Sequence, residues 1–167
     1  AWRIARSDFG IARKKLTIPE GSTVRDIAAI ADNALIHFDT ARFIELAKEK
    51  EGYLFPDTYF FFSNAAPDEV IEVLENNFKR RTASLAESIS RSEQSFADSI
   101  IMASIIEAEA NKPADRRIVS GILWKRMQNK MRLQVDAPFF YLRQESTEDE
   151  VTVDDLKSDS PYNTYTH

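Results

Sequence analysis

The sequence contains no cysteine, so neither a disulfide nor a thiolate metal site can form. Its two histidines, His37 and His167, are far apart, and neither belongs to a metal-ligand cluster or a Ser-His-Asp triad. Only four glycines occur, and none of them forms a glycine-rich phosphate loop. We therefore expect that this protein uses no metal and no cofactor.

Long apolar runs are also absent. The sequence contains no run of eighteen apolar residues, the length needed to span a bilayer, and no signal peptide is visible. The chain begins at Ala1 rather than at a methionine, so we expect a fragment of a longer protein. The net charge of −5 provides no basic footprint for phosphates, which argues against nucleic acid as a partner.

Apolar periodicity and helix-end signals predict a helix-rich chain with a few short strands. Short strands are expected at 15–18, 58–62 and 133–136. Helices are expected at 24–31, 40–50, 68–90, 96–110 and 114–129, and a short turn is expected at 153–157. Three helix starts carry a polar capping residue, namely Ser22 or Thr23, Thr40 and Ser95, and Thr152 caps the short turn. We expect an α+β fold with a division near residue 50.

The helix predicted over 96–110 is apolar nearly all the way round, which indicates burial, yet it carries Glu107 and Glu109. A buried carboxyl group tends to keep its proton, and a protonated carboxylic acid is what general acid catalysis requires. At about 100° per residue the two glutamates point roughly 200° apart, so they cannot share one site.

Glu107 is the candidate for a cleft-facing acid, because it lies on the polar stripe that also holds Ser104 and Asn111. The alternative is that Glu107 only occupies a polar edge at the end of the helix. Glu109 lies on the apolar side and is expected to be structural. A buried charge needs a partner, which would be Arg116, Arg117 or Arg126.

No second acid stands at a spacing that makes a glycosidase pair obvious. Gln134 and Asp136 would project from one face of the short strand at 133–136, which makes Asp136 the best polar partner. Turn formation or helix capping is the alternative role for both residues.

Aromatic residues crowd the segment 53–62. Exposed aromatic faces could stack on sugar rings, but such residues are more often core. We expect Phe55, Phe60 and Phe62 in the core, and Tyr53 and Tyr59 to be more open.

Five segments, in order and at suitable spacing, resemble the YceG-like family of endolytic murein transglycosylases. Each is weak alone, but together they span nearly the whole chain. The segments are Thr17-Ile18-Pro19-Glu20-Gly21, Glu51-Gly52-Tyr53-Leu54-Phe55-Pro56-Asp57-Thr58-Tyr59, Ala103-Ser104-Ile105-Ile106-Glu107-Ala108-Glu109, Met131-Arg132-Leu133-Gln134-Val135-Asp136 and Ser160-Pro161-Tyr162-Asn163-Thr164-Tyr165.

The resemblance implies a remnant of a small LysM-like α/β subdomain over residues 1–50 and a helix-rich transglycosylase domain over 51–167 that lacks its C-terminal segment. It also implies a bacterial inner-membrane protein with one N-terminal membrane helix outside this fragment and an extracytoplasmic catalytic domain. The expected substrate is nascent peptidoglycan, cleaved between N-acetylmuramic acid and N-acetylglucosamine without water to leave 1,6-anhydromuramyl ends. The expected partners are glycan strands and other cell-wall synthesis proteins.

The family's catalytic glutamate maps onto Glu107, which would act first as acid and then as base. The residues expected to line the cleft are Ser104, Gln134, Asp136, Tyr162, Asn163 and Tyr165. The family commonly has Asp-Pro-Thr after the glutamine, whereas this chain has Asp136-Ala137-Pro138, so a threonine role is lost or moved. Three other hypotheses remain open: a non-catalytic peptidoglycan-binding module, a hydrolytic lysozyme-like glycosidase and a helical adaptor.

Overall fold

The computed structural model of the chain describes residues 12–91, 94–143 and 151–167. These residues belong to two units, with the boundary along the chain between residues 94 and 95. The sequence predicts a division near residue 50, but strand β2 (Thr58–Phe62) pairs with strand β1 (Arg13–Thr17) and carries the first unit beyond that point. Helices with one small two-stranded sheet confirm the coarse α+β class.

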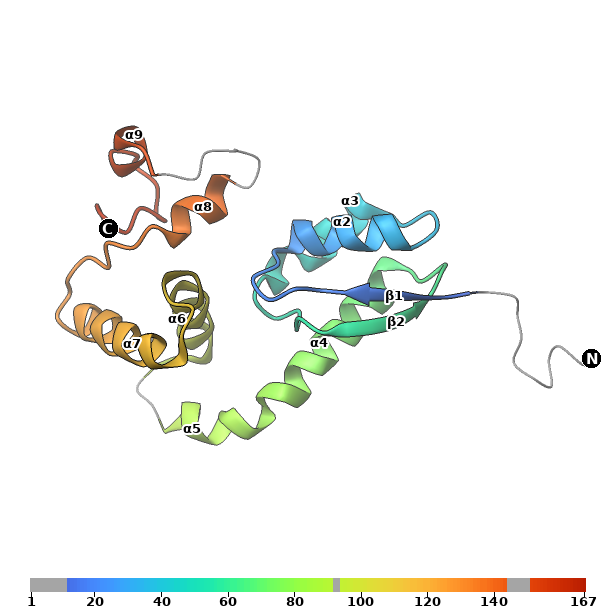
Figure 1. Ribbon diagram of the computed structural model, residues 1–167, viewed down its shortest axis with the longest axis horizontal. Coiled ribbons are helices and arrows are strands. Elements are labelled where there is room, and N and C mark those ends of the chain that lie inside the picture. Colours follow the sequence, from blue (N-terminus) through green and yellow to red (C-terminus); the bar gives the residue numbers. More distant parts are fainter. Residues whose placement is uncertain (1–11, 92–93, 144–150) are drawn as a thin grey trace, which may run out of the picture. The chain divides into compact units, whose positions relative to one another are not determined.

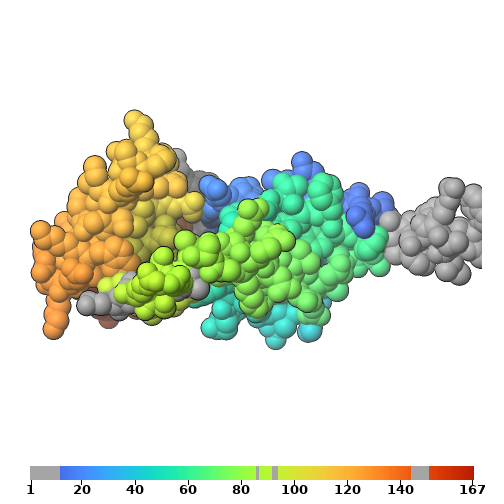
Figure 2. All heavy atoms as spheres, turned by 90° about the horizontal axis from the view of Figure 1, so that it is seen from below, coloured from blue at the N-terminus to red at the C-terminus, as the bar shows by residue number. Residues whose placement is uncertain are grey.

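The first unit is built around this antiparallel sheet, in which Leu16 lies opposite Tyr59. Helices α2 and α3 separate the two strands in the sequence and lie beside the sheet (Figure 1). The core combines Leu16 with apolar residues from α2, α3 and α4. In Figure 2, side chains of α4 form part of the outer surface of this unit. The helical elements of the unit are α2 (Val24–Ala34), α3 (Thr40–Ala47), η1 (Lys48–Lys50), α4 (Pro67–Thr82), η2 (Ala83–Leu85) and α5 (Ala86–Ser90).

Local capping explains where helices α2 and α3 of the first unit begin. Thr23, one of the two predicted capping residues, caps α2 and forms a capping box with Asp26. Helix α3 is capped by Asp39, one residue before the predicted Thr40. The predicted long helix 68–90 is shorter, because the 3-10 turn η2 separates α4 from α5.

The buried face of β2 is formed by Tyr59 and Phe61, not by the phenylalanines that the sequence analysis assigns to the core. Phe61 is only 3% exposed, whereas Phe60 is 64% and Phe62 is 45% exposed. Three consecutive phenylalanines hide the period of two that normally identifies the inner face of a strand. Pairing with β1 settles the register, because Leu16, the buried residue of β1, lies opposite Tyr59.

Hydrogen bonds attach the turn before β2 to helix α4. The Tyr59 hydroxyl donates to the Phe55 carbonyl oxygen at 2.6 Å, and Asn77 Nδ2 donates to the Tyr59 hydroxyl at 2.8 Å. Arg81 forms an ion pair with Asp57 at 3.1 Å. Burial raises the pKa of Tyr59 above its usual value. This segment, one of the five that carry the family resemblance, therefore acts as a structural anchor.

The second unit consists of helices with their own small core. Met102 and Ile105 of α6 pack with Leu123 of α7 and with Val135. Ser95 caps α6, as predicted, but the segment 133–136 is not the predicted strand. Among the described residues of the chain, no helix is long and apolar enough to cross a membrane. The helices of this unit are α6 (Phe96–Glu109), α7 (Pro113–Gln128), α8 (Ala137–Arg143) and α9 (Val153–Leu156).

Candidate active site

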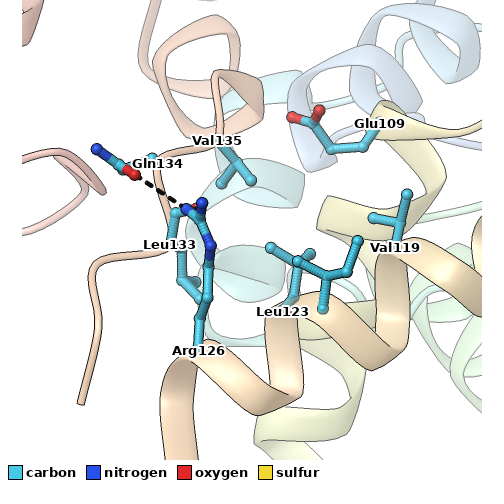
Figure 3. A pocket seen from close by; sticks show the side chains of 8 residues that line it. Glu109, Val119, Leu123, Arg126, Leu133, Gln134 and Val135 are labelled. Carbon is cyan, nitrogen blue, oxygen red and sulfur yellow. Dashed lines mark hydrogen bonds between the residues drawn. The ribbon is translucent and has the colours of Figure 1, made fainter. Parts of the chain in front are cut away.

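A pocket of about 200 Å³ opens in the second unit, between the end of α6, one face of α7 and the segment 133–135 (Figure 3). This volume is below the roughly 300–1,000 Å³ of a typical small-molecule site, so it suits one group of a larger ligand. Its apolar lining consists of Val119, Ile122, Leu123, Leu133 and Val135.

Three polar side chains complete the pocket: Glu109, Arg126 and Gln134. Figure 3 shows the Glu109 carboxylate on one side of the pocket and the Arg126 guanidinium on the other. The sequence analysis predicts an ion pair between Glu109 and an arginine. In the described part of the chain, no arginine lies within ion-pair distance of Glu109, so this prediction is wrong. The carboxylate is therefore available to a ligand.

The arginines near Glu109 bind backbone instead. Arg116 Nε donates to the Ala110 carbonyl at 2.8 Å. Arg126 Nη1 donates to the Leu133 carbonyl at 2.6 Å and to Gln134 Oε1 at 3.1 Å. Arg126 thus attaches the pocket-lining segment to the last turn of α7.

Gln134 has a left-handed backbone, with a φ of 54°. A residue with a side chain adopts this conformation only where its surroundings hold it there, and such residues concentrate at functional sites. Two contacts hold Gln134: its N–H donates to the Thr164 carbonyl at 3.0 Å, and its side chain accepts from Arg126. The left-handed residue explains why 133–136 is not the predicted strand.

The C-terminal residues support this segment from its other side. The Val135 N–H donates to Thr164 Oγ1 at 3.1 Å, and the Thr164 hydroxyl donates to the Val135 carbonyl at 2.6 Å. The Tyr165 hydroxyl donates to Asp136 Oδ1 at 2.7 Å. Two family-like segments that are distant in sequence therefore meet beside the pocket.

Tyr165 lies within the electrostatic reach of both charged pocket residues. Its hydrogen bond to Asp136 is the main cause that raises its pKa above the usual value. The Glu109 charge adds to this increase, and the Arg126 charge opposes it. Asp136 is half-buried and orients Tyr165, which places both residues beside the pocket without making either a lining residue.

The model of the YceG-like family matches residues 3–167. The chain belongs to the YceG-like family. This confirms the resemblance drawn from the five sequence segments. Part of the chain is 32% identical to the endolytic murein transglycosylase of Bacillus subtilis, in a match that covers 90% of this chain and 49% of the relative.

Other relatives agree with this assignment. A match to the endolytic murein transglycosylase of Streptococcus pneumoniae has 28% identity and covers 69% of this chain and 22% of that protein. The crystal structure of a yceG-like protein from Listeria monocytogenes superimposes with a TM-score of 0.80 at 26% identity, covering 99% of this chain and 64% of that one. The YceG-like chain therefore spans about half or less of the length of these curated relatives.

Within this YceG-like chain, Glu109 and not Glu107 lines the pocket. Glu109 continues the face of α6 that carries Met102 and Ile105, and this face packs on α7. Glu107 is half-buried on another side of the helix. The sequence feature that could have identified Glu109 as a pocket residue is its spacing of four positions from Ile105. This spacing places Glu109 at the C-terminal end of the face of α6 that packs on α7.

The expected burial of α6 and its carboxylates is also wrong. Only Met102 and Ile105 are buried within α6, while Ile101 is 59% exposed. Glu109 is exposed and Glu107 is half-buried. The cause is that α7 and α8 contact α6 in this unit and cover only part of its surface.

Asn163 cannot line a cleft, because it is 0% exposed and its amide is already used. Its Nδ2 donates to the carbonyls of Ser158 at 2.8 Å, Leu156 at 3.1 Å and Asp155 at 3.3 Å. Its Oδ1 accepts from the Tyr165 N–H at 3.0 Å. Asn163 is therefore a structural residue that shapes the C-terminal loop, and the predicted ligand role does not fit its environment.

Of the remaining predicted site residues, one lines the pocket and two do not. Gln134 lines the pocket, as expected of a cleft residue. Ser104 is exposed away from it, and its hydroxyl donates to the Ile101 carbonyl at 2.8 Å. Tyr162 is half-exposed and packs against Tyr141, with ring centroids 6.2 Å apart. Neither Ser104 nor Tyr162 is among the pocket-lining residues.

Proposed function

We propose that this YceG-like chain is the catalytic part of an endolytic lytic transglycosylase that acts on peptidoglycan. Two curated relatives carry the name endolytic murein transglycosylase, which supports the substrate class. The observation that carries the proposal is the Glu109 carboxylate, which lies at the edge of a pocket without an ion-pair partner among the described residues.

Glu109 serves as acid and then as base. It first donates its proton to the glycosidic oxygen between N-acetylmuramic acid and N-acetylglucosamine, and the bond breaks through an oxocarbenium-like state. The 2-acetamido group stabilises that state by attacking the anomeric carbon. The ionised Glu109 then removes the proton from the muramyl C6 hydroxyl, whose oxygen bonds to the anomeric carbon and closes the 1,6-anhydro ring. No water is consumed, and Glu109 regains the proton that it donated.

A single acid is sufficient for this sequence because the two proton transfers occur one after the other. General acid–base catalysis of this kind contributes roughly 10²–10⁴-fold to the rate. The apolar pocket lining, with Leu123 and Val135, supports one sugar ring of the strand. A strand lying over Glu109 excludes water and strengthens the hydrogen bond to the glycosidic oxygen.

The test compares Glu109→Gln with Glu107→Gln, two isosteric changes two positions apart on α6. Purified glycan strands are incubated with each variant, and 1,6-anhydro ends are measured by mass spectrometry. We expect Glu109→Gln to lose at least about 100-fold in rate, consistent with loss of acid–base catalysis, and Glu107→Gln to retain most of it. Circular dichroism verifies that both variants are folded.

The opposite result would return the catalytic role to Glu107, as the sequence analysis predicts. Products one water heavier than the anhydro form would indicate a hydrolytic glycosidase. Strand binding without products from the unchanged chain would favour a peptidoglycan-binding module, and absence of both would favour an adaptor.

We also propose the location and the organisation that the family resemblance implies. The native protein is a single-pass inner-membrane protein whose catalytic part faces the extracytoplasmic side, where it meets other cell-wall synthesis proteins. The first unit contains a LysM-like subdomain, a proposal supported by its strand-helix-helix-strand order from β1 to β2. Fractionation of cells that produce the native protein tests the location.

A further inference from the structure

Arg126 commits only one of its guanidinium nitrogens to the protein. Nη1 donates to the carbonyls of Leu133 at 2.6 Å and Arg132 at 3.3 Å, and to Gln134 Oε1 at 3.1 Å. Among the described residues, neither Nε nor Nη2 has a hydrogen-bond partner. These two nitrogens form a planar fork whose spacing matches the two oxygens of a carboxylate.

The position of this fork is fixed before any ligand arrives. Three contacts of Nη1 hold the guanidinium against the segment 132–134, so little side-chain entropy remains to be lost on binding. Arg126 lines the pocket together with Glu109, and no carboxylate of the described chain pairs with it there. The pocket thus offers the Arg126 guanidinium on one side and the Glu109 carboxyl group on the other (Figure 3).

We propose that Arg126 binds a carboxylate carried by the muramyl residue of the strand and so determines which glycosidic bond lies at Glu109. This inference rests on the proposed function. The two sugars alternate along the strand, and only the muramyl residue bears a lactyl substituent. Its carboxyl group is free in a bare strand, whereas in a substituted strand the carboxylates belong to the attached peptide stem.

The recognition has a direct consequence for bond selection. A muramyl carboxylate held by Nε and Nη2 places the muramyl ring in the apolar part of the pocket, beside Val135. The bond that leaves its anomeric carbon then faces Glu109. A strand shifted by one sugar would leave the arginine fork without its carboxylate, so Arg126 would disfavour cleavage on the other side of the muramyl residue.

The test measures binding in the Glu109→Gln background, so that the strands stay intact. Three end-labelled preparations are compared by fluorescence anisotropy: strands with peptide stems, strands freed of stems by an amidase, and freed strands whose lactyl carboxylates are converted to amides. We expect amidation to weaken binding about 10-fold, the effect of losing one charge-assisted contact. Tighter binding by stem-bearing or by freed strands identifies which carboxylate Arg126 holds.

Arg126→Gln is expected to remove this preference, so that the affinity ratio between freed and amidated strands falls to about 1. Arg117→Gln is the matched control, because Arg117 is an exposed residue of α7 that does not line the pocket, and the ratio should persist. If Arg126→Gln fails to fold, Arg126→Lys replaces it, because lysine keeps the charge but lacks the planar fork, and the affinity ratio is again expected to fall.

Equal affinity for freed, amidated and stem-bearing strands overturns the inference, as does a strand preference that Arg126→Gln leaves unchanged. The proposed function is tested separately, by anhydro ends in the chain with Glu109 intact. A carboxylate-dependent affinity without anhydro products would refute the catalytic proposal and bond selection with it, and would leave only carboxylate binding by Arg126 standing.

Discussion

Replacing Asn163 with alanine tests whether this residue stabilises the fold or binds a ligand. At Asn163 the role predicted from the sequence differs clearly from the environment in the structure. The side chain is fully buried, and its amide bonds to the carbonyls of Leu156 and Ser158 and to the Tyr165 N–H. The Asn163→Ala change removes these bonds and leaves their partners inside the C-terminal loop. The expected effect is therefore a loss of stability before any loss of affinity.

The magnitude follows from the bonds. A buried hydrogen bond contributes about 1 kcal/mol net, so the loss of three well-formed bonds lowers the free energy of unfolding by about 3 kcal/mol. Asn163→Asp is expected to cost more, because a carboxylate would face the Ser158 and Leu156 carbonyls that the amide now bonds. Urea denaturation followed by Trp124 fluorescence measures this, since Trp124 packs against the core of the same unit. The only other tryptophan, Trp2, is replaced with phenylalanine in all variants.

Asn111→Ala serves as the control, because Asn111 is exposed in the same unit. It is expected to change stability by less than about 0.5 kcal/mol. An Asn163→Ala protein with unchanged stability but a several-fold higher KM for glycan strands would refute the structural assignment and restore the predicted contact with substrate.

Two further predictions test the tyrosine beside the pocket and the register of β2. The hydrogen bond to Asp136 raises the pKa of Tyr165, so the folded state favours the neutral phenol. The contribution of this hydrogen bond to the stability of the fold is complete below pH 10. It is lost as the pH rises through the pKa of Tyr165 in the folded state. In the unchanged chain, the free energy of unfolding should fall between pH 9 and pH 11. In Tyr165→Phe this fall should be smaller by roughly the contribution of one hydrogen bond, as measured by urea denaturation at each pH. Phe61→Ala should destabilise the first unit by about 3–5 kcal/mol, whereas Phe60→Ala should change stability by less than about 0.5 kcal/mol.

These two measurements have clear contrary outcomes. The same alkaline loss in Tyr165→Phe as in the unchanged chain would mean that the Asp136 contact does not persist in solution. A larger destabilisation by Phe60→Ala than by Phe61→Ala would mean that the opposite face of β2 is buried.

Helix starts could be predicted from sequence because they depend on local chemistry. Thr23 and Ser95 cap helices where a cap is predicted, and Thr152 caps the predicted turn, which forms helix α9. A short side chain identifies such a start because it reaches backbone only three residues away. The buried face of β2 could not be predicted, because Phe60, Phe61 and Phe62 are equally apolar and the choice depends on pairing with a strand distant in sequence.

The candidate site was predictable only in part, for the same reason. The correct helix and the correct segment around Gln134 are recognisable from residue type and order. The choice between Glu107 and Glu109 depends on how α6 packs on α7, and helical periodicity favours the polar stripe instead. Asn163 shows the converse error, because this polar residue of a family-like segment is buried and serves the fold.

The two strands of the first unit also constrain the order in which this unit assembles. Thr17 and Thr58, which face each other at the end of the sheet, are 41 positions apart, and both α2 and α3 lie between them. Bringing such distant positions together costs about 3 kcal/mol of chain entropy, and no contact between the strands offsets this cost until they meet. Helices α2 and α3, whose contacts are local, shorten the intervening path first. We therefore expect the sheet to form late in folding, after α2 and α3, rather than to act as the folding nucleus.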